Sequence, residues 1–153
     1  MLSRRLILLS LASLAACGGG TRPRAKPDQN IPLHRNETPQ LRALINKYSD
    51  HYEVPRSLTH RVIQRESRYH PGARNGPYYG LMQILPQTAR GMGFRGDASD
   101  LLDAETNLKY GVKYLRGAWL VSDGSQDRAV TWYARGYYYE AKKRGMLKQT
   151  GLR

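Results

Sequence analysis

The sequence predicts one mostly α-helical domain that follows an export signal and a tether. Three observations lead to this prediction. Apolar residues recur at helical spacing in several segments, capping residues and prolines stand where helices would begin, and no segment shows the alternation of a β-strand. With 153 residues, of which 40% are hydrophobic, the chain is long enough for one compact domain with a buried core.

Residues 1–16 have the pattern of a bacterial lipoprotein signal peptide. Two arginines precede an apolar run that is too short for a comfortable membrane span, and small residues follow it. The end of the segment, Leu-Ala-Ala followed by Cys17, resembles a lipobox, which implies that Cys17 is lipidated and begins the mature protein. The alternative is an ordinary signal peptide with an incidental thiol. Because Cys17 is the only cysteine, no internal disulfide can form, and lipidation would account for it.

The composition after Cys17 predicts how the protein is held. Residues 17–37 are rich in glycine, proline and charge, so we expect a flexible tether on a lipid anchor, with the folded domain at residues 38–153. Gly18 stands where many inner-membrane lipoproteins of Gram-negative bacteria have aspartate. That resemblance favours an exported lipoprotein of the cell envelope, on the periplasmic face of the outer membrane.

The chain is strongly basic, with 25 lysines and arginines against 12 acidic residues and a formal net charge of +13. Such an excess repels itself and predicts an anionic partner, with solubility alone as the alternative. Removal of residues 1–16 takes away two arginines, so the exported chain would still carry +11 on its side chains. For an exported protein we expect no nucleic acid partner and favour the carboxylate-bearing cell wall.

The first two helices are predicted from their boundaries. Thr38-Pro39 reads as an N-cap followed by proline at the first helical position, and apolar residues at helical spacing continue to Tyr48. A break at Val54-Pro55 precedes a second helix, which we expect Pro71 to stop. Residues 71–80 predict a loop because of their glycines, prolines and polar residues.

The later helices follow the same logic. Pro86 predicts a short helix that ends at nearby glycines. Asp103 caps a longer helix whose apolar face runs to Trp119, and Ser125 caps another that runs to Gly136. The last helix is predicted over residues 137–144, and its three consecutive tyrosines are expected to pack within the fold.

One carboxylate lies on the apolar face of the second predicted helix. Glu66 follows Val62 by four residues and Ile63 by three, so it points the same way as both. Burial among apolar neighbours disfavours the charged form of a carboxyl group and raises its pKa. Such a group can keep its proton near neutral pH and deliver it to a leaving oxygen, as the general acid of glycoside cleavage does. The alternative is a surface glutamate that pairs with Arg65 or Arg68.

The sequence offers no pattern for several other chemistries. Its four histidines lack the paired spacing of metal ligands, and it contains neither a glycine-rich phosphate loop nor a cysteine suited to act as a nucleophile. Ser67 lies in no serine-nucleophile pattern. We therefore expect no metal and no cofactor.

Short motifs around Glu66 resemble the lytic transglycosylase family. Glu66-Ser67 is followed by Pro71, by Gly-Leu-Met-Gln at residues 80–83, and by Pro86 with Thr-Ala two residues later. Residues 104–115 resemble the segment before the family's penultimate motif, so the resemblance covers roughly residues 41–140. It implies a lysozyme-like fold, of the goose-type-lysozyme-like kind, and cleavage of peptidoglycan between N-acetylmuramic acid and N-acetylglucosamine.

The resemblance implies a mechanism with one catalytic carboxylate. Glu66 would protonate the oxygen of the β-1,4 glycosidic bond and then act as base toward the sugar's own C6 hydroxyl, which gives a 1,6-anhydro product. Ordinary glycosidases instead use two carboxylates at a set separation. The other acids of this region are expected to be caps and solvated charges: Asp97, Asp100, Asp103 and Glu105.

The resemblance also implies which residues bind the glycan. Met82 and Gln83 would line the cleft, Ser67 would support the bound sugar, and the hydroxyl of Tyr133 would hydrogen-bond Glu66. Tyr79 and its neighbour Tyr78 would either stack on sugar rings or pack within the loop, and both interpretations stay open.

One departure from the family concerns its closing Ala-Tyr-Asn element. This chain has Trp132-Tyr133-Ala134 there, followed by Arg135-Gly136. The missing amide usually helps to hold the substrate's N-acetyl group, so its loss bears on efficiency and on substrate register. Two alternatives therefore stay open beside a lytic transglycosylase: a non-catalytic peptidoglycan-binding lipoprotein, and a goose-type lysozyme that uses water. Glu66 argues against the binder, which would gain nothing from a desolvated carboxylate.

Overall fold

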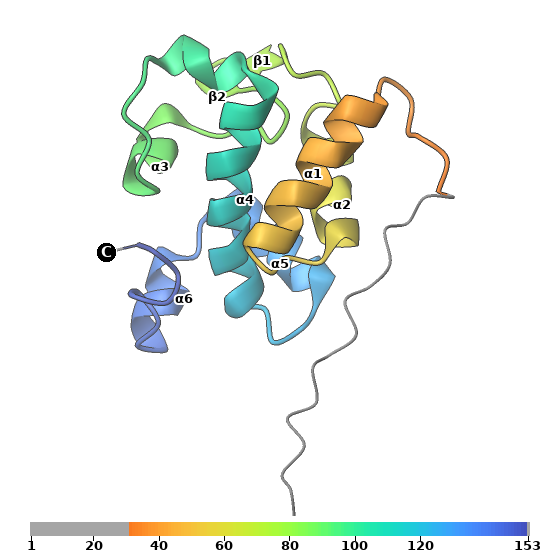
Figure 1. The fold of residues 1–153 in the computed structure, drawn as a ribbon. Helices are drawn as coiled ribbons and strands as arrows, with labels where there is room; N and C mark the ends of the chain where they lie inside the picture. Colours follow the sequence, from red (N-terminus) through yellow and green to blue (C-terminus); the bar gives the residue numbers. More distant parts are fainter. Residues whose placement is uncertain (1–30, 153) are drawn as a thin grey trace, which may run out of the picture. The chain divides into compact units, whose positions relative to one another are not determined.

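The structure is a computed structural model that describes residues 31–152, and its residues from Pro32 onward form one compact unit. The predictions for the signal peptide, for Cys17 and for most of the tether lie outside the described residues. The mostly helical fold that the sequence predicts is confirmed (Figure 1). Its elements are α1 (Pro39–His51), α2 (Arg56–Glu66), β1 (Arg74–Asn75), β2 (Tyr78–Tyr79), α3 (Pro86–Gly91), the 3-10 helix η1 (Ala98–Leu102), α4 (Ala104–Leu120), α5 (Gln126–Arg135) and α6 (Tyr138–Lys143).

Three predicted N-caps hold the helix starts. The side chain of Thr38 accepts a hydrogen bond from the Leu41 amide at the start of α1. The side chain of Asp103 accepts a hydrogen bond from the Thr106 amide at the start of α4, and that of Ser125 accepts one from the Arg128 amide at the start of α5. Each cap pairs one of the backbone N–H groups that the first turn of a helix leaves without a partner.

Helix α4 forms the centre of the described domain. It contacts α1, α3, α5 and η1, and Figure 1 shows it between α1 and the segment that carries α3. Its inward face is apolar and fully buried at Leu108, Val112 and Leu115. Helices α1 and α2 are also joined by a buried hydrogen bond from the Ser49 hydroxyl to that of Thr59. These helices therefore form a packed core around α4.

Two boundary predictions were wrong. Helix α2 ends at Glu66, five residues before Pro71, because Arg68 and Tyr69 take positive φ angles of 51° and 65°, which no α-helix contains. The segment 71–80 is also not wholly loop, since β1 and β2 pair there as a two-residue antiparallel ladder. The early end of α2 leaves Glu66 in its last turn, beside the β1–β2 hairpin.

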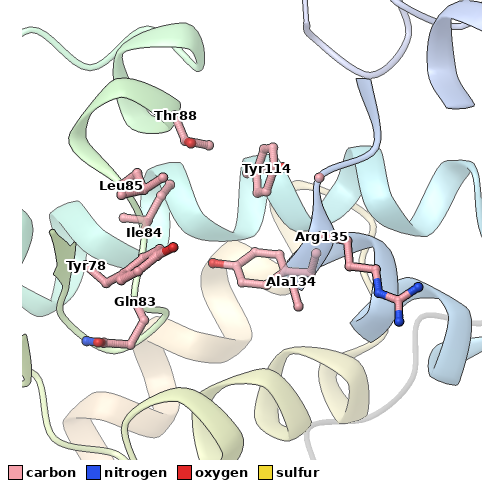
Figure 2. Close-up of a pocket in the computed structure, with 10 residues that line it drawn as sticks. Tyr78, Gln83, Ile84, Leu85, Thr88, Tyr114, Ala134 and Arg135 are labelled. Carbon is pink, nitrogen blue, oxygen red and sulfur yellow. The ribbon is translucent and has the colours of Figure 1, made fainter. Parts of the chain in front are cut away.

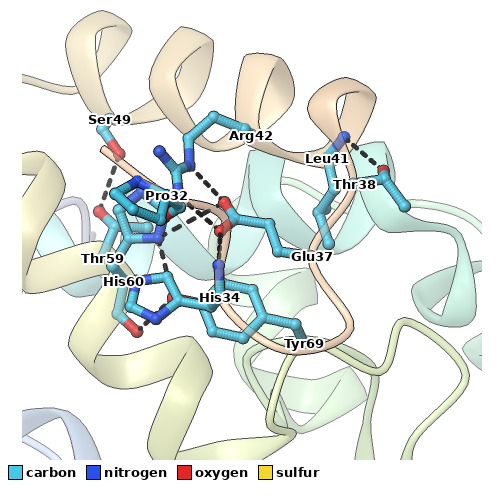
Figure 3. Close-up of polar contacts among 10 residues, drawn as sticks. All are labelled: Pro32, His34, Glu37, Thr38, Leu41, Arg42, Ser49, Thr59, His60 and Tyr69. Carbon is cyan, nitrogen blue, oxygen red and sulfur yellow. Dashed lines mark hydrogen bonds and ion pairs between the residues drawn. The ribbon is translucent and has the colours of Figure 1, made fainter. Parts of the chain in front are cut away.

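The tether prediction extended too far, because residues 32–37 pack on the domain. Glu37 is only 7% exposed and receives hydrogen bonds from the Arg42 guanidinium on both carboxylate oxygens, at 2.5 and 2.6 Å (Figure 3). The His34 amide donates a third, at 2.9 Å. Burial alone would raise the pKa of Glu37, but these hydrogen bonds outweigh it and the pKa is lowered. Glu37 thus fixes the chain where it enters α1.

Within residues 31–152, no helix combines the length and apolar character that a membrane span requires.

Candidate active site

Two adjoining pockets form one cleft beside the end of α2. The first, the Glu66 pocket, has a volume of about 360 Å³, and the second, the Arg135 pocket, about 350 Å³. Four residues line both pockets, so the two are compartments of one cleft: Tyr78, Gln83, Tyr133 and Ala134. Figure 2 shows Tyr78 and Gln83 on one side of the Arg135 pocket and the end of α5, with Ala134 and Arg135, on the other.

Glu66 is the only carboxylate among the described residues that line the cleft. Its side chain is 23% exposed, so it reaches the cleft while most of it is removed from water. Burial raises the pKa of Glu66, and the Arg65 guanidinium, 3.5 Å away, opposes this more weakly. The carboxyl group therefore holds its proton to higher pH than an exposed glutamate would. This is the property that the sequence predicted from its place on the apolar face.

Gln83 is held in place by the loop that carries it. Its side-chain N–H₂ donates to the carbonyls of Gly80, at 2.9 Å, and Ala73, at 3.1 Å. The residue takes a φ of 47°, a left-handed conformation that is uncommon outside glycine. Gly80 is also left-handed, at 71°, and a Cβ there would collide with Asn107. This tight turn presents Gln83 to both pockets, and its contact with a glycan stays a prediction.

Asn107 on α4 organises the same turn, and the sequence analysis missed it. Its side-chain oxygen accepts from the Met82 amide at 2.9 Å, and its N–H₂ donates to the carbonyls of Tyr79 and Leu101 at 2.8 and 2.7 Å. Asn107 is fully buried, and a buried amide must find such partners. An asparagine amid the apolar positions of a predicted helix was the signal available in the sequence.

Met82 does not line the cleft, contrary to the expectation. Its side chain is fully buried and lies against Gly111 on α4, where a Cβ would come within 2.7 Å of its sulfur. Met82 contributes to the site through its backbone instead. Its carbonyl accepts a 2.7 Å hydrogen bond from the hydroxyl of Tyr133.

Tyr133 lies in both pockets but does not make the predicted hydrogen bond to Glu66. Its hydroxyl donates to Met82, and burial raises its pKa well above the usual value, with a further contribution from the charge of Glu66. Tyr133 is therefore a neutral phenol that joins α5 to the Met82–Gln83 turn.

The two tyrosines of β2 lie in different surroundings. Tyr78, which is 42% exposed, lines both pockets, whereas Tyr79 lines neither. Successive side chains of a strand point to opposite faces, so only one of the pair can face the cleft. Tyr79 packs against the cluster around Ile84 and lies under the Arg74 guanidinium, 4.7 Å from its ring centre.

Ser67 lies next to Glu66 but lines neither pocket. It is 8% exposed, and its hydroxyl donates to the Ile63 carbonyl at 3.3 Å, one turn back along α2. Its support of a bound sugar stays a prediction. Of the three consecutive tyrosines, only Tyr137 is buried as expected, while Tyr138 and Tyr139 are 45% and 83% exposed.

One cluster of ligand-type side chains lies away from the cleft. Atoms of His34, Glu37 and His60 lie within 4.8 Å of one another (Figure 3). Both oxygens of Glu37 already accept from Arg42, whose positive charge disfavours a cation at that position. The Nδ1 atom of His60 lies 2.9 Å from the Tyr69 hydroxyl, and burial lowers the pKa of His60 to about 4. We assign this cluster to the packing of the entering chain.

Comparisons with known proteins show to which family the chain is related. The model of the family described as "Transglycosylase SLT domain" matches residues 43–150. The chain is 31% identical over 96 residues to soluble lytic murein transglycosylase of Escherichia coli K12, a match that covers 58% of this chain and 14% of that protein. It is 32% identical over 96 residues to membrane-bound lytic murein transglycosylase C of Serratia proteamaculans, covering 57% of this chain and 27% of that protein. No solved structure matches the chain significantly. Because the family model covers well over half of the sequence, including Glu66 and the whole cleft, this chain belongs to the transglycosylase SLT domain family.

Proposed function

We propose that the protein is a peptidoglycan lytic transglycosylase that cleaves the β-1,4 bond between N-acetylmuramic acid and N-acetylglucosamine with Glu66 as its single catalytic carboxylate. The observation that carries the proposal is the composition of the cleft. Glu66 is the only carboxylate among the cleft residues within 31–152, and burial raises the pKa of that group. The names of the related proteins, both lytic murein transglycosylases, support the same substrate.

One carboxylate is sufficient for this reaction. Glu66 donates its proton to the glycosidic oxygen while the bond between that oxygen and C1 breaks. The C6 hydroxyl of the same sugar then attacks C1 and gives its proton to Glu66. A C1–O6 bond replaces the broken bond, no water is consumed, and Glu66 returns to its protonated form. A hydrolase of the two-carboxylate kind would need a second acid across the cleft.

The neutral groups around Glu66 suit a sugar ligand. Tyr78 offers an exposed ring on which a sugar ring can stack. Gln83 offers its amide oxygen as an acceptor, held in a fixed position because its N–H₂ group donates to the carbonyls of Ala73 and Gly80. The pockets are walled by Tyr133 and Ala134, which carry no charge near neutral pH. A cleft of this kind fits a polyhydroxylated, largely uncharged backbone.

Mass spectrometry of purified peptidoglycan after incubation with the protein tests the proposal. We expect muropeptides that end in 1,6-anhydro-N-acetylmuramic acid, each lighter by one water than its hydrolysed counterpart. Hydrated ends would favour a goose-type lysozyme reaction. Binding without any released fragment would favour a non-catalytic binding lipoprotein.

We propose further that Cys17 is lipidated and holds the domain at the cell envelope, on the periplasmic face of the outer membrane. The lipobox-like sequence before Cys17 supports this, and so does the membrane-bound relative. Cys17→Ser should move the protein from the membrane fraction to the soluble exported fraction. A Cys17→Ser protein that still sediments with membranes at high salt would rule out this anchor.

A further inference from the structure

Among the described residues that line the Arg135 pocket, one is charged. Of the ten residues that line it, Arg135 alone is ionised near neutral pH, and the others are apolar or neutral polar side chains and a glycine. In the Glu66 pocket, by contrast, the Arg65 guanidinium has an acidic neighbour, because it lies 3.5 Å from Glu66. The two arginines of the cleft therefore differ in their surroundings. Arg65 has a carboxyl group beside it, whereas no carboxyl group is among the described residues that line the pocket of Arg135.

Arg135 has no anionic partner within the part of the chain that the structure describes. It is exposed at the last position of α5, and the ion pairs among residues 31–152 do not include it. Figure 2 shows its stem beside Ala134 and its guanidinium turned away from Gln83, toward the outside of the pocket. A cation in this position is available to a group that projects outward from a ligand bound in the cleft.

Neutral sugar rings would not require a cation here. A guanidinium pairs best with carboxylates, which it can bind through two parallel hydrogen bonds. In peptidoglycan the carboxylates are on the peptides attached to N-acetylmuramic acid, which project away from the glycan backbone. Ala134, next to Arg135, is small and exposed, so the side chain at position 134 leaves room for a ligand group to approach the guanidinium.

We infer that Arg135 is a specificity-determining residue that binds a carboxylate of the peptide on the glycan, so that the cleft prefers peptide-bearing strands to strands without peptides. This inference rests on the proposed function for the identity of the substrate. It assigns to Arg135 a contact that the catalytic chemistry of Glu66 does not require.

A purely structural role for Arg135 makes a different prediction. A basic residue in the last turn of a helix is stabilised by the helix dipole, and Arg135 is at such a position. Loss of that effect would lower the stability of the fold and weaken the binding of all ligands by the same factor. It would not change the ratio of the affinities for two glycans that differ only in their peptides.

The test measures dissociation constants by isothermal titration calorimetry in the Glu66→Gln protein, which binds without cleaving. The ligands are a tetrasaccharide fragment of peptidoglycan with its peptides and the same fragment after an amidase has removed them. We expect the peptide-bearing fragment to bind more tightly, and Arg135→Gln to reduce that advantage about three- to tenfold, as for a partly exposed charged contact. Arg135→Lys should keep part of the advantage of the peptide-bearing fragment, because the charge remains while the paired hydrogen bonds are lost.

Arg90→Gln is the matched control. Arg90 is an exposed arginine in the last turn of α3, and it lines neither pocket. Arg90→Gln changes the net charge by the same amount as Arg135→Gln. It should leave unchanged the ratio of the affinities for the peptide-bearing and peptide-free fragments. The inference is overturned if Arg135→Gln weakens both fragments by the same factor, if Arg90→Gln lowers the ratio as much, or if neither fragment binds. A preference for the peptide-bearing fragment that depends on Arg135, in a wild-type protein that releases no anhydro product, would uphold the inference while the proposed activity fails.

Discussion

The hydroxyl of Tyr133 on α5 donates a 2.7 Å hydrogen bond to the carbonyl of Met82, the residue before Gln83 in the turn that lines the cleft. The Met82 amide is held from the other side by Asn107 on α4. Both backbone groups of one buried residue are thus paired with side chains from two helices. This arrangement fixes the position of Gln83 relative to Glu66.

Tyr133→Phe should lower both stability and turnover. It removes the donor and leaves the buried Met82 carbonyl without a partner, which costs about 1–3 kcal/mol of the free energy of unfolding. Urea denaturation measures that loss, and glycan cleavage at constant folded fraction measures the effect on Gln83. Tyr137→Phe is the control, since it deletes a similar 2.8 Å bond to the Tyr114 carbonyl and lines neither pocket. Equal turnover in the two variants would show that the Tyr133 bond does not position the site.

Ala134→Asn should raise turnover several-fold. Ala134 lines both pockets, so an amide at this position can reach the substrate, and one neutral hydrogen bond contributes about 0.5–1.5 kcal/mol. Steady-state release of muropeptides measures the gain. Ala134→Leu, which adds similar bulk without hydrogen-bonding atoms, should show no gain. If Ala134→Asn loses activity, the end of α5 has been rebuilt around alanine.

Stability should fall as the pH is lowered from 6.5 to about 4. Burial lowers the pKa of His60 from 6.5 to about 4, so the unfolded chain binds a proton in this interval that the folded chain does not. Because one pKa unit corresponds to about 1.36 kcal/mol, the free energy of unfolding falls by about 3 kcal/mol at most. Below 4.5 the lowered pKa of Glu37 adds to the loss in the same direction.

Urea denaturation at a series of pH values checks this prediction. His60→Gln should flatten the slope between pH 6.5 and 4, because the titrating group is gone. His51→Gln is the matched control, because His51 is an exposed histidine of α1, and this variant should keep the wild-type slope. An unchanged slope in His60→Gln would assign the pH dependence to other groups.

The pH dependence of cleavage should report the state of Glu66. As a general acid Glu66 must be protonated, so kcat/KM should fall as the pH rises through its raised pKa. Arg65 lowers that pKa, so Arg65→Gln should move the alkaline limb to higher pH. Arg61→Gln, one turn earlier on α2 and paired with Asp127, should leave the limb in place. A limb that moves to lower pH in Arg65→Gln would contradict the role of Glu66 as the acid.

The parts of the fold that depend on local sequence were predictable. The caps Thr38, Asp103 and Ser125 form hydrogen bonds to amides three residues away, and proline and glycine marked most helix ends. The early end of α2 was not predictable, because Arg68 and Tyr69 take left-handed backbone conformations that their types rarely adopt. Tyr69 is fully buried, so tertiary packing outweighs local preference there.

The site was predictable in its chemistry and less so in its geometry. The helical spacing of Glu66 from Val62 and Ile63 predicted its partial burial, and burial raises the pKa of the carboxyl group. The orientation of Tyr78 against Tyr79 depends on the register of a two-residue ladder, and a shift of one residue exchanges the two faces. The burial of Met82 depends on Gly111, 29 positions later in the chain, and no local pattern reveals such a contact.

The central claim is that Glu66 alone supplies the proton chemistry, and replacing Glu66 with glutamine tests it most directly. Glutamine keeps the shape of the side chain but cannot deliver a proton, and general acid–base catalysis contributes roughly 10²–10⁴-fold. The measurement is the initial rate of release of 1,6-anhydro-muropeptides from purified peptidoglycan, with Glu105→Gln, an exposed carboxylate outside the cleft, as the control. We predict that Glu66→Gln loses at least about 10²-fold while remaining folded and that Glu105→Gln stays near the wild-type rate. Near-normal release by a folded Glu66→Gln protein would contradict the claim.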